Sequence, residues 1–241
     1  MDRAVSFLQT VLDKDPSNAE AHVLMGSTHL VRNAQAEALK SFKSAIERQP
    51  KKVIGYRALA DLHIRQNQTD EALKVIKAGL QMQPDSSALR ILLASVLELK
   101  GEYEGAIAEY ESILQKEPGS LVVANNLASL LTDHRSDRNS HERAYNLALT
   151  LRKSQVPHFK DTLGWIHYQR GEHKAALSLL EEAATELPTL SLVRYHLAMN
   201  YIALSEPAKA EDQLKKALEL ASNDSELTNK IRTALQQSLK N

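Results

Sequence analysis

Residues 19–50 read AEAHVLMGSTHLVRNAQAEALKSFKSAIERQP, and stretches of the same pattern follow along the chain. Apolar residues recur within this stretch at three- and four-residue steps, which is the spacing of amphipathic helices. A proline closes it, and such prolines stand 34 residues apart at Pro16, Pro50, Pro84 and Pro118. A period of this length indicates a solenoid of helix–turn–helix units.

Small residues mark the place where the two helices of each unit cross. When the closing proline is numbered 32, position 8 is Gly or Ala and position 20 is Ala in every unit. These pairs are Gly26/Ala38, Ala60/Ala72, Ala94/Ala106, Ala128/Ala144, Gly164/Ala176 and Ala198/Ala210. Only small side chains let two helix backbones pack about 8–10 Å apart. Position 27 is also small in the regular units, except for Ile113.

These residue types at these spacings resemble the tetratricopeptide repeat (TPR). The resemblance implies an all-α fold, a right-handed TPR superhelix (an α-solenoid) of antiparallel helix pairs. We expect one solenoid to cover residues 1–241. Its expected parts are a half repeat over 1–18, regular repeats over 19–52, 53–86, 87–120, 157–190 and 191–224, an irregular repeat over 121–156 and a capping helix over 225–241.

The two ends of the chain carry different expectations. The alignment starts the chain on the second helix of a repeat, so we interpret it as a fragment of a longer protein. That uncapped first helix offers a surface for self-association with another copy. At the other end, Ser225 is the expected N-cap of the capping helix. Its expected apolar face is Leu227, Ile231, Leu235 and Leu239.

The irregular repeat contains an insertion. Ala128 and Ala144 are 16 residues apart, whereas the other position 8 and position 20 pairs are 12 apart. The stretch Thr132–His141 reads TDHRSDRNSH, and its polarity predicts that the extra residues lie in the turn between the two helices. Two interpretations stay open, because an insertion in a solenoid forms either a tolerated surface loop or a loop that contacts a partner.

Composition limits the function. The chain has 30 Lys and Arg against 30 Asp and Glu. This balance argues against nucleic-acid binding, which needs a basic surface. The chain has no cysteine, and no apolar run in it reaches the roughly 18 residues of a membrane span. No catalytic motif is found, so we predict no catalytic residue, no cofactor and no enzyme activity.

The histidines are interpreted as structural. His29, His63 and His167 share position 11, so each lies a repeat away from the next and they do not converge on one ion. His134 and His141 share the inserted stretch with two aspartates, which is a weak pattern for a metal. We therefore predict no metal site.

A groove is the expected binding surface. The TPR resemblance implies that the first helix of each pair lines it. We expect the partner-binding residues to be Asn125, Asn126, Ser129, Asp161, Trp165, Tyr168, Tyr195 and Met199. Aromatic side chains with amides are typical of peptide-binding hot spots. The alternative is that Trp165 packs between helices or under the inserted stretch. The Lys/Asn carboxylate clamp of chaperone-tail binders is absent, so acidic C-terminal tails are not the expected ligand.

Three functions remain open at this point. The first is a non-catalytic scaffold whose partner is a protein or peptide held in the groove, without nucleic acid and without membrane insertion by this segment. The second is a self-assembling structural protein. The third is the regulatory arm of an enzyme whose catalytic domain lies upstream.

A narrower resemblance concerns two segments. Asn125–Arg135 (NNLASLLTDHR) is the first, and Asp161–Tyr168 with Arg194–Ala198 (DTLGWIHY … RYHLA) is the second. With the irregular repeat, they resemble the C-terminal repeats of bacterial TPR lipoproteins associated with the exosortase/PEP-CTERM system and exopolysaccharide loci. The resemblance implies an exported, lipid-anchored scaffold, periplasmic or at the outer membrane, for protein sorting or polysaccharide assembly. Without that relationship the expected compartment is the cytoplasm.

Overall fold

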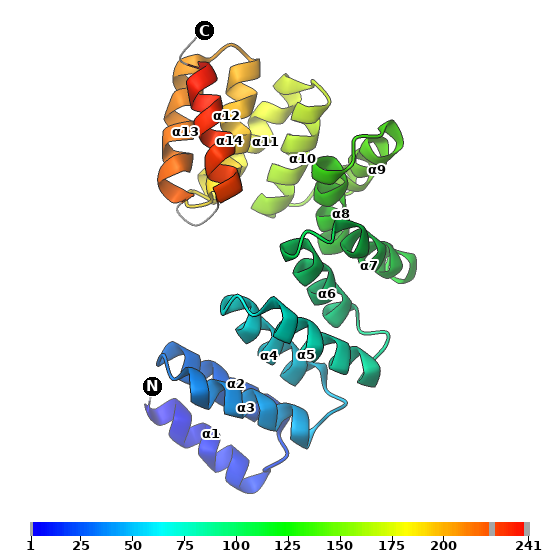
Figure 1. Cartoon of the computed structure of the whole chain (residues 1–241), viewed down its shortest axis with the longest axis vertical. Helices are drawn as coiled ribbons and strands as arrows, with labels where there is room; N and C mark the ends of the chain where they lie inside the picture. The colour runs from blue at the N-terminus through cyan, green and yellow to red at the C-terminus, as the bar shows by residue number, and fades with distance from the viewer. Residues whose placement is uncertain (1, 222–224, 239–241) are drawn as a thin grey trace. The chain divides into compact units, whose positions relative to one another are not determined.

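The computed structural model describes residues 2–221 and 225–238 as helices joined by short turns. No strand occurs among these residues, and the all-α helical-repeat class predicted from the sequence is confirmed. The chain divides into two compact units, Met1–Pro118 and Gly119–Asn241. Figure 1 labels their helices in chain order.

The first unit consists of one helix followed by three helix pairs. Its helices are α1 (Asp2–Lys14), α2 (Ala19–Val31), α3 (Gln35–Arg48), α4 (Val53–Arg65), α5 (Thr69–Met82), α6 (Ser87–Leu99) and α7 (Tyr103–Lys116). Helix α2 packs on α3, α4 on α5 and α6 on α7, while the first helices α2, α4 and α6 also contact one another in order.

The second unit consists of three helix pairs and a final helix. Its helices are α8 (Leu121–His134), α9 (Arg138–Leu149), α10 (Pro157–Gln169), α11 (His173–Glu186), α12 (Ser191–Ala203), α13 (Pro207–Leu220) and α14 (Ser225–Ser238). Helix α10 contacts both α8 and α12, and we call these three helices the first-helix layer of the unit.

The predicted crossing points are closely packed. Ala60 and Ala72 are both 0 % exposed, as are the alanines at the same positions of the other pairs. A Cβ added to Gly26 would lie 2.4 Å from Cε1 of Phe42, which is closer than two carbon atoms can approach. The prediction that only small residues fit at the crossings is therefore confirmed.

Each regular turn between paired helices depends on one residue in the left-handed region. Asn33, Asn67, Gly101, Gly171 and Ser205 have φ between +56° and +76°, and all five occupy position 15 of their repeats. Glycine and asparagine adopt this conformation more readily than other residues. The sequence analysis missed this signal, although the residue types are visible at that position.

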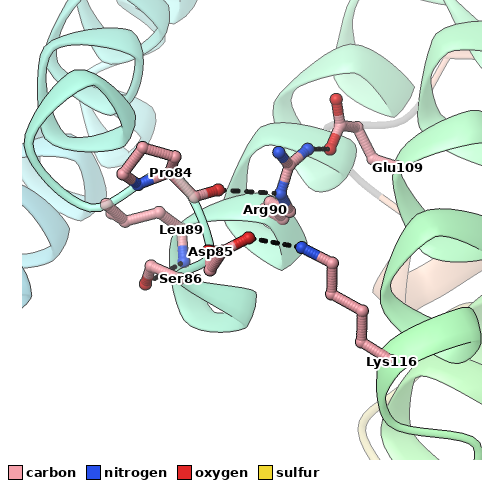
Figure 2. A network of polar contacts seen from close by, with 7 residues as sticks. All are labelled: Pro84, Asp85, Ser86, Leu89, Arg90, Glu109 and Lys116. Carbon is pink, nitrogen blue, oxygen red and sulfur yellow. Dashed lines mark hydrogen bonds and ion pairs between the residues drawn. The ribbon is translucent and has the colours of Figure 1, made fainter.

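A polar network closes the junction between two repeats of the first unit (Figure 2). Nε of Arg90 donates to the carbonyl oxygen of Pro84 at 3.2 Å, and Nη1 of Arg90 lies 2.6 Å from Oε2 of Glu109. Lys116 pairs with Asp85 beside this contact. The arginine thus holds the closing proline of one repeat and the second helix of the next.

The same device occurs in the second unit. There Nε of Arg194 donates to the carbonyl oxygen of Pro188 at 2.8 Å, and Nη1 donates to Oε1 of Gln213 at 2.9 Å. Arg194 and Arg90 both occupy position 4 of their repeats, so the contact follows the repeat period.

The inserted residues of the irregular repeat are not a loop, which corrects the prediction for 132–141. Helix α8 continues to His134, and α9 begins at Arg138, so the turn between them is only 135–137. Asp137 caps α9 by accepting a hydrogen bond from the backbone N–H of Ser140 at 2.9 Å. Such an N-cap satisfies a free amide of the first turn.

The extra residues before Ala144 are therefore helical. Helix α8 has 14 residues, where the first helices of the other pairs have 13. Helix α9 begins earlier relative to Ala144, although with 12 residues it is shorter than the second helices of the other pairs, which have 14.

The terminal helices pack unequally. Leu227 and Ile231 of α14 are buried against Leu214 and neighbouring residues of α12 and α13. The predicted capping role of Ser225 and the packing of Leu239 lie outside the described side chains. On α1, Phe7 is 66 % exposed, and self-association through this helix stays a prediction.

Candidate functional site

The eight expected partner-binding residues all lie on the first-helix layer of the second unit. None of them is fully exposed: Asp161 and Trp165 are buried, and the other six are half-buried. Trp165 therefore packs between helices, as in the alternative interpretation, and partner binding by the eight residues stays a prediction.

Trp165 is the centre of this cluster. Its indole stacks on Tyr168 of the same helix, with centroids 4.7 Å apart, and on His196 of α12 at 4.1 Å. The indole Nε1–H donates to Oδ1 of Asp133 at 3.0 Å, and the residue is 9 % exposed. Asp133 belongs to the last turn of α8, so the indole joins three first helices.

A buried acidic side chain orients the histidine. Nδ1 of His196 lies 3.0 and 3.1 Å from the two carboxylate oxygens of Asp161. An ionised carboxylate only accepts hydrogen bonds, so the hydrogen is assigned to Nδ1. This contact holds the imidazole flat against Trp165.

The amides and the serine of α8 bind mainly to their own helix. Nδ2 of Asn125 donates to Oδ1 of Asn126 at 3.3 Å, whereas Oδ1 of Asn125 is buried without a hydrogen-bond partner among the described residues. Oγ of Ser129 donates to Oδ2 of Asp133 at 3.4 Å. Ser129 is thus linked to Trp165 through the same aspartate.

The two tyrosines sit at the edge of the cluster. The ring of Tyr195 lies 6.3 Å from that of Trp165, and Tyr168 contacts the ring of His173 at 5.4 Å. Burial raises the pKa of both tyrosine hydroxyls. Met199 instead packs with the apolar residues of α13 and α14.

The structure thus joins five of the eight expected residues in one network. Asp161, Trp165, Tyr168, Tyr195 and Ser129 belong to it. The two asparagines and Met199 lie beside it. Two further members were missed as site residues, namely Asp133 and His196. Both could have been considered from the repeat pattern, because each lies on a first helix next to that of Trp165: Asp133 on α8 and His196 on α12.

Comparison with known families decides the class of the repeat. Family models described as tetratricopeptide repeat match residues 2–52 and 57–120 in the first unit and residues 167–232 in the second. Together these ranges cover more than half of the chain. The chain belongs to the tetratricopeptide repeat family. No curated protein matches its sequence.

Solved structures share the TPR fold. A crystal structure of the APC/C hetero-tetramer Cut9–Hcn1 matches with a TM-score of 0.78 and 16% identity, over 99% of this chain and 46% of that chain. The chain therefore spans less than half the length of that relative.

Two bacterial structures match over most of their own length. A tetratricopeptide repeat protein from Parabacteroides merdae matches with a TM-score of 0.68 and 17% identity, over 98% of this chain and 91% of that one. PilF of Pseudomonas aeruginosa matches with a TM-score of 0.69 and 15% identity, over 92% and 99%. Identities this low show the fold alone.

The first unit of this TPR chain has a different lining. An open cleft of about 490 Å³ lies between α2 and α4, and Phe42 of α3 also contributes to it. Its charged residues are Arg57, Asp61 and Arg65, all on α4. The sequence analysis did not single out this cleft, because its lining shows no aromatic or amide cluster.

Two of the histidines at position 11, His63 and His167, contact the turns that follow their helices. Nδ1 of His63 lies 2.7 Å from Oε1 of Gln68, and Nδ1 of His167 lies 2.6 Å from Oε2 of Glu172. Within the described part of the chain, no group of three or more side chains is placed to bind a metal ion.

The segment with the weak metal-binding pattern serves other contacts. Nε2 of His141 lies 2.7 Å from the carbonyl oxygen of Arg135, so this ring closes the short turn before α9.

Among the described helices, none is both long and apolar enough to cross a membrane.

Proposed function

We propose that this TPR chain is a non-catalytic scaffold that holds a peptide or partner helix against the first-helix layer of its second unit. TPR repeats generally mediate contacts between proteins. The residues proposed for contact are the eight expected from the sequence, with Tyr168 and Tyr195 as the outermost groups of the aromatic cluster.

One observation carries this proposal. The hydroxyls of Tyr168 and Tyr195 form no hydrogen bond with any described residue, whereas the indole, the imidazole and the carboxylates of the cluster are all paired inside it. A rigid aromatic platform with free hydroxyls at its edge suits a partner backbone, since tyrosines supply contact area at low entropic cost.

The test is a pull-down with the purified chain from lysate of the source organism, followed by titration of the captured partner. The double variant Tyr168→Phe/Tyr195→Phe keeps both rings and removes only the hydroxyls. We expect binding about tenfold weaker, because each lost hydrogen bond costs about 0.5–1.5 kcal/mol.

The control is Tyr145→Phe, which removes a hydroxyl from α9, outside the first-helix layer. It should bind the partner like the wild type. Equal affinity of the double variant, with unchanged circular dichroism, would refute a role for this layer in binding.

A narrower proposal places the scaffold in a bacterial envelope, in protein sorting or polysaccharide assembly. It is supported only by the resemblance of Asn125–Arg135 and Asp161–Tyr168 to TPR lipoproteins of exosortase-associated loci. The identity of the partner captured above tests it, because a partner from another process would exclude this role.

A further inference from the structure

The cleft of the first unit contains three charged side chains that influence one another electrostatically but make no close contact with a partner among the described residues. Arg57, Asp61 and Arg65 form no hydrogen bond or ion pair with any described residue. Many other charged residues of the unit are paired, as in the Lys52–Glu20 contact at 2.6 Å. Exposed lysines elsewhere in the unit, such as Lys43 and Lys77, also form no ion pair with any described residue, so the cleft is distinguished by the alignment of its charges and not by their lack of partners.

The three side chains form one stripe. They follow at four-residue steps along α4, so they lie on one face of the helix. At 1.5 Å per residue, the two arginines are about 12 Å apart along the axis, with Asp61 midway between them. The arginines are exposed, whereas Asp61 is half-buried at a lower level of the cleft.

Apolar side chains border the stripe. Val31 of α2 is 69 % exposed and Ile54 of α4 is 38 % exposed, and both line the cleft. Exposed aliphatic groups beside unpaired guanidinium groups fit a ligand that carries both apolar and anionic side chains. The net charge of the lining is positive, because two arginines stand against one aspartate.

From this geometry we propose that the cleft between α2 and α4 binds an extended peptide segment with two acidic side chains four residues apart. In an extended chain, four residues span about 13 Å and their side chains point to the same side. This separation matches the two arginines. The residue midway faces Asp61, where a hydrogen-bond donor such as Ser, Thr, Asn or Lys fits.

The inference rests on the proposed function as a peptide-binding scaffold and adds a second surface with its own ligand chemistry. Each guanidinium presents a planar fork that matches a carboxylate in two hydrogen bonds. Asp61 sets the alignment, because an acidic residue placed over it is repelled. Flanking apolar residues of the peptide contact Val31 and Ile54.

A display library of random 12-residue peptides tests the proposal. It is selected in parallel on the full wild-type chain, on Arg57→Glu/Arg65→Glu and on the control Lys43→Glu/Lys77→Glu. The control makes the same change in net charge on α3 and α5, where both lysines are exposed and lie outside the cleft lining. Unchanged thermal melting by circular dichroism confirms that each variant is folded.

We expect the wild type and the control to enrich peptides with two acidic residues four apart and a donor between them. Binding of a synthetic peptide of this class should weaken at least tenfold on Arg57→Glu/Arg65→Glu. The same peptide with lysines in place of its acidic residues should prefer that variant. Arg57→Gln/Arg65→Gln repeats the test without introducing negative charge.

Two results overturn the inference, and they are distinguishable. If the selected peptides bind the cleft variants as tightly as they bind the wild type, the cleft is not their binding site. The scaffold proposal then still stands, provided that Tyr168→Phe/Tyr195→Phe weakens the binding of these peptides. If no peptide is enriched on any of the chains, the cleft does not bind such a segment, whereas the scaffold proposal is decided by its own pull-down with Tyr168→Phe/Tyr195→Phe.

Discussion

Helices α4 and α10 carry side chains of different chemical character at the same positions of the repeat. Position 5 is Arg57 on α4 and Asp161 on α10, and position 9 is Asp61 on α4 and Trp165 on α10. On α10 both side chains have partners from neighbouring helices. On α4 neither has one.

This difference shows that the same repeat position can serve the fold on one helix and stay open to a ligand on another. In the second unit, the outer hydroxyls of Tyr168 and Tyr195, and not the inner groups, are therefore open to a partner. In the second unit, α8 and α12 supply an acceptor and a stacking ring, so the polar and aromatic groups of α10 are satisfied within the chain. In the first unit, α2 presents mainly aliphatic side chains toward α4, so charged groups stay open. Arg57 and Arg65 are exposed and hydrated, whereas Asp61 is half-buried, so a ligand that donates a hydrogen bond to Asp61 would offset part of its desolvation.

The largest expected effect is loss of stability at Trp165. The variant Trp165→Ala removes two ring contacts and a hydrogen bond from a buried site, so the free energy of unfolding should fall by about 3–5 kcal/mol. Urea unfolding followed by circular dichroism measures it. Asp61→Ala, at the same position of the other unit, should change stability by no more than about 0.5 kcal/mol. If the free energy of unfolding fell by similar amounts in the two variants, position 9 would have the same structural role in both units.

A smaller effect is expected at Asp133, which accepts the hydrogen bond of the indole. The variant Asp133→Ala leaves the Nε1–H without its partner, and the expected loss of stability is about 1 kcal/mol. Because Trp165 is the single tryptophan of the chain, its fluorescence reports directly on this site. We expect the emission of Asp133→Ala to shift.

The matched control for this variant is Asp133→Asn, which keeps an oxygen that can accept the hydrogen bond. It should preserve most of the wild-type spectrum and stability. An emission spectrum of Asp133→Ala that is identical to that of the wild type would mean that the contact contributes nothing.

The sequence was sufficient to predict the helix pairs and their crossings. The reason is physical: the closest approach of two helices leaves no room for a larger side chain, so Ala60, Ala72 and Gly164 identify the contact directly. Such a constraint acts on one residue at a time and repeats with the period. It can therefore be detected from the sequence without knowing which residues contact that position in the fold.

The environment of Trp165 was not predictable in the same way. Periodicity placed it on a first helix, but its burial depends on Asp133, which belongs to a stretch expected to be a loop. The structure extends α8 through this residue to His134. The wrong loop prediction hid the role of Asp133, although packing of Trp165 between helices or under this stretch was an alternative that the sequence left open.

The smallest predicted effect concerns the charge of Asp61. Burial raises the pKa of its carboxyl group, and the nearby Arg57 and Arg65 oppose this shift. Helix α2 contributes no charged residue to the cleft. Because the pKa is higher in the folded state, the protonated form favours folding. This contribution is fully present below the pKa of the unfolded chain and is lost as pH rises through the folded-state pKa.

The variant Asp61→Asn cannot ionise, so it should be as stable as the wild type at pH 7 or more stable, by up to about 0.5 kcal/mol. The difference should vanish near pH 3, where the wild-type carboxyl is protonated. Urea unfolding at pH 7, 5 and 3 measures it. The control Asp161→Ala should have the opposite sign at pH 7, because it removes the partner of a buried histidine. If Asp61→Asn were less stable at pH 7, the carboxylate would have a partner within the chain in solution. The polar groups of α4 would then be paired internally, as those of α10 are.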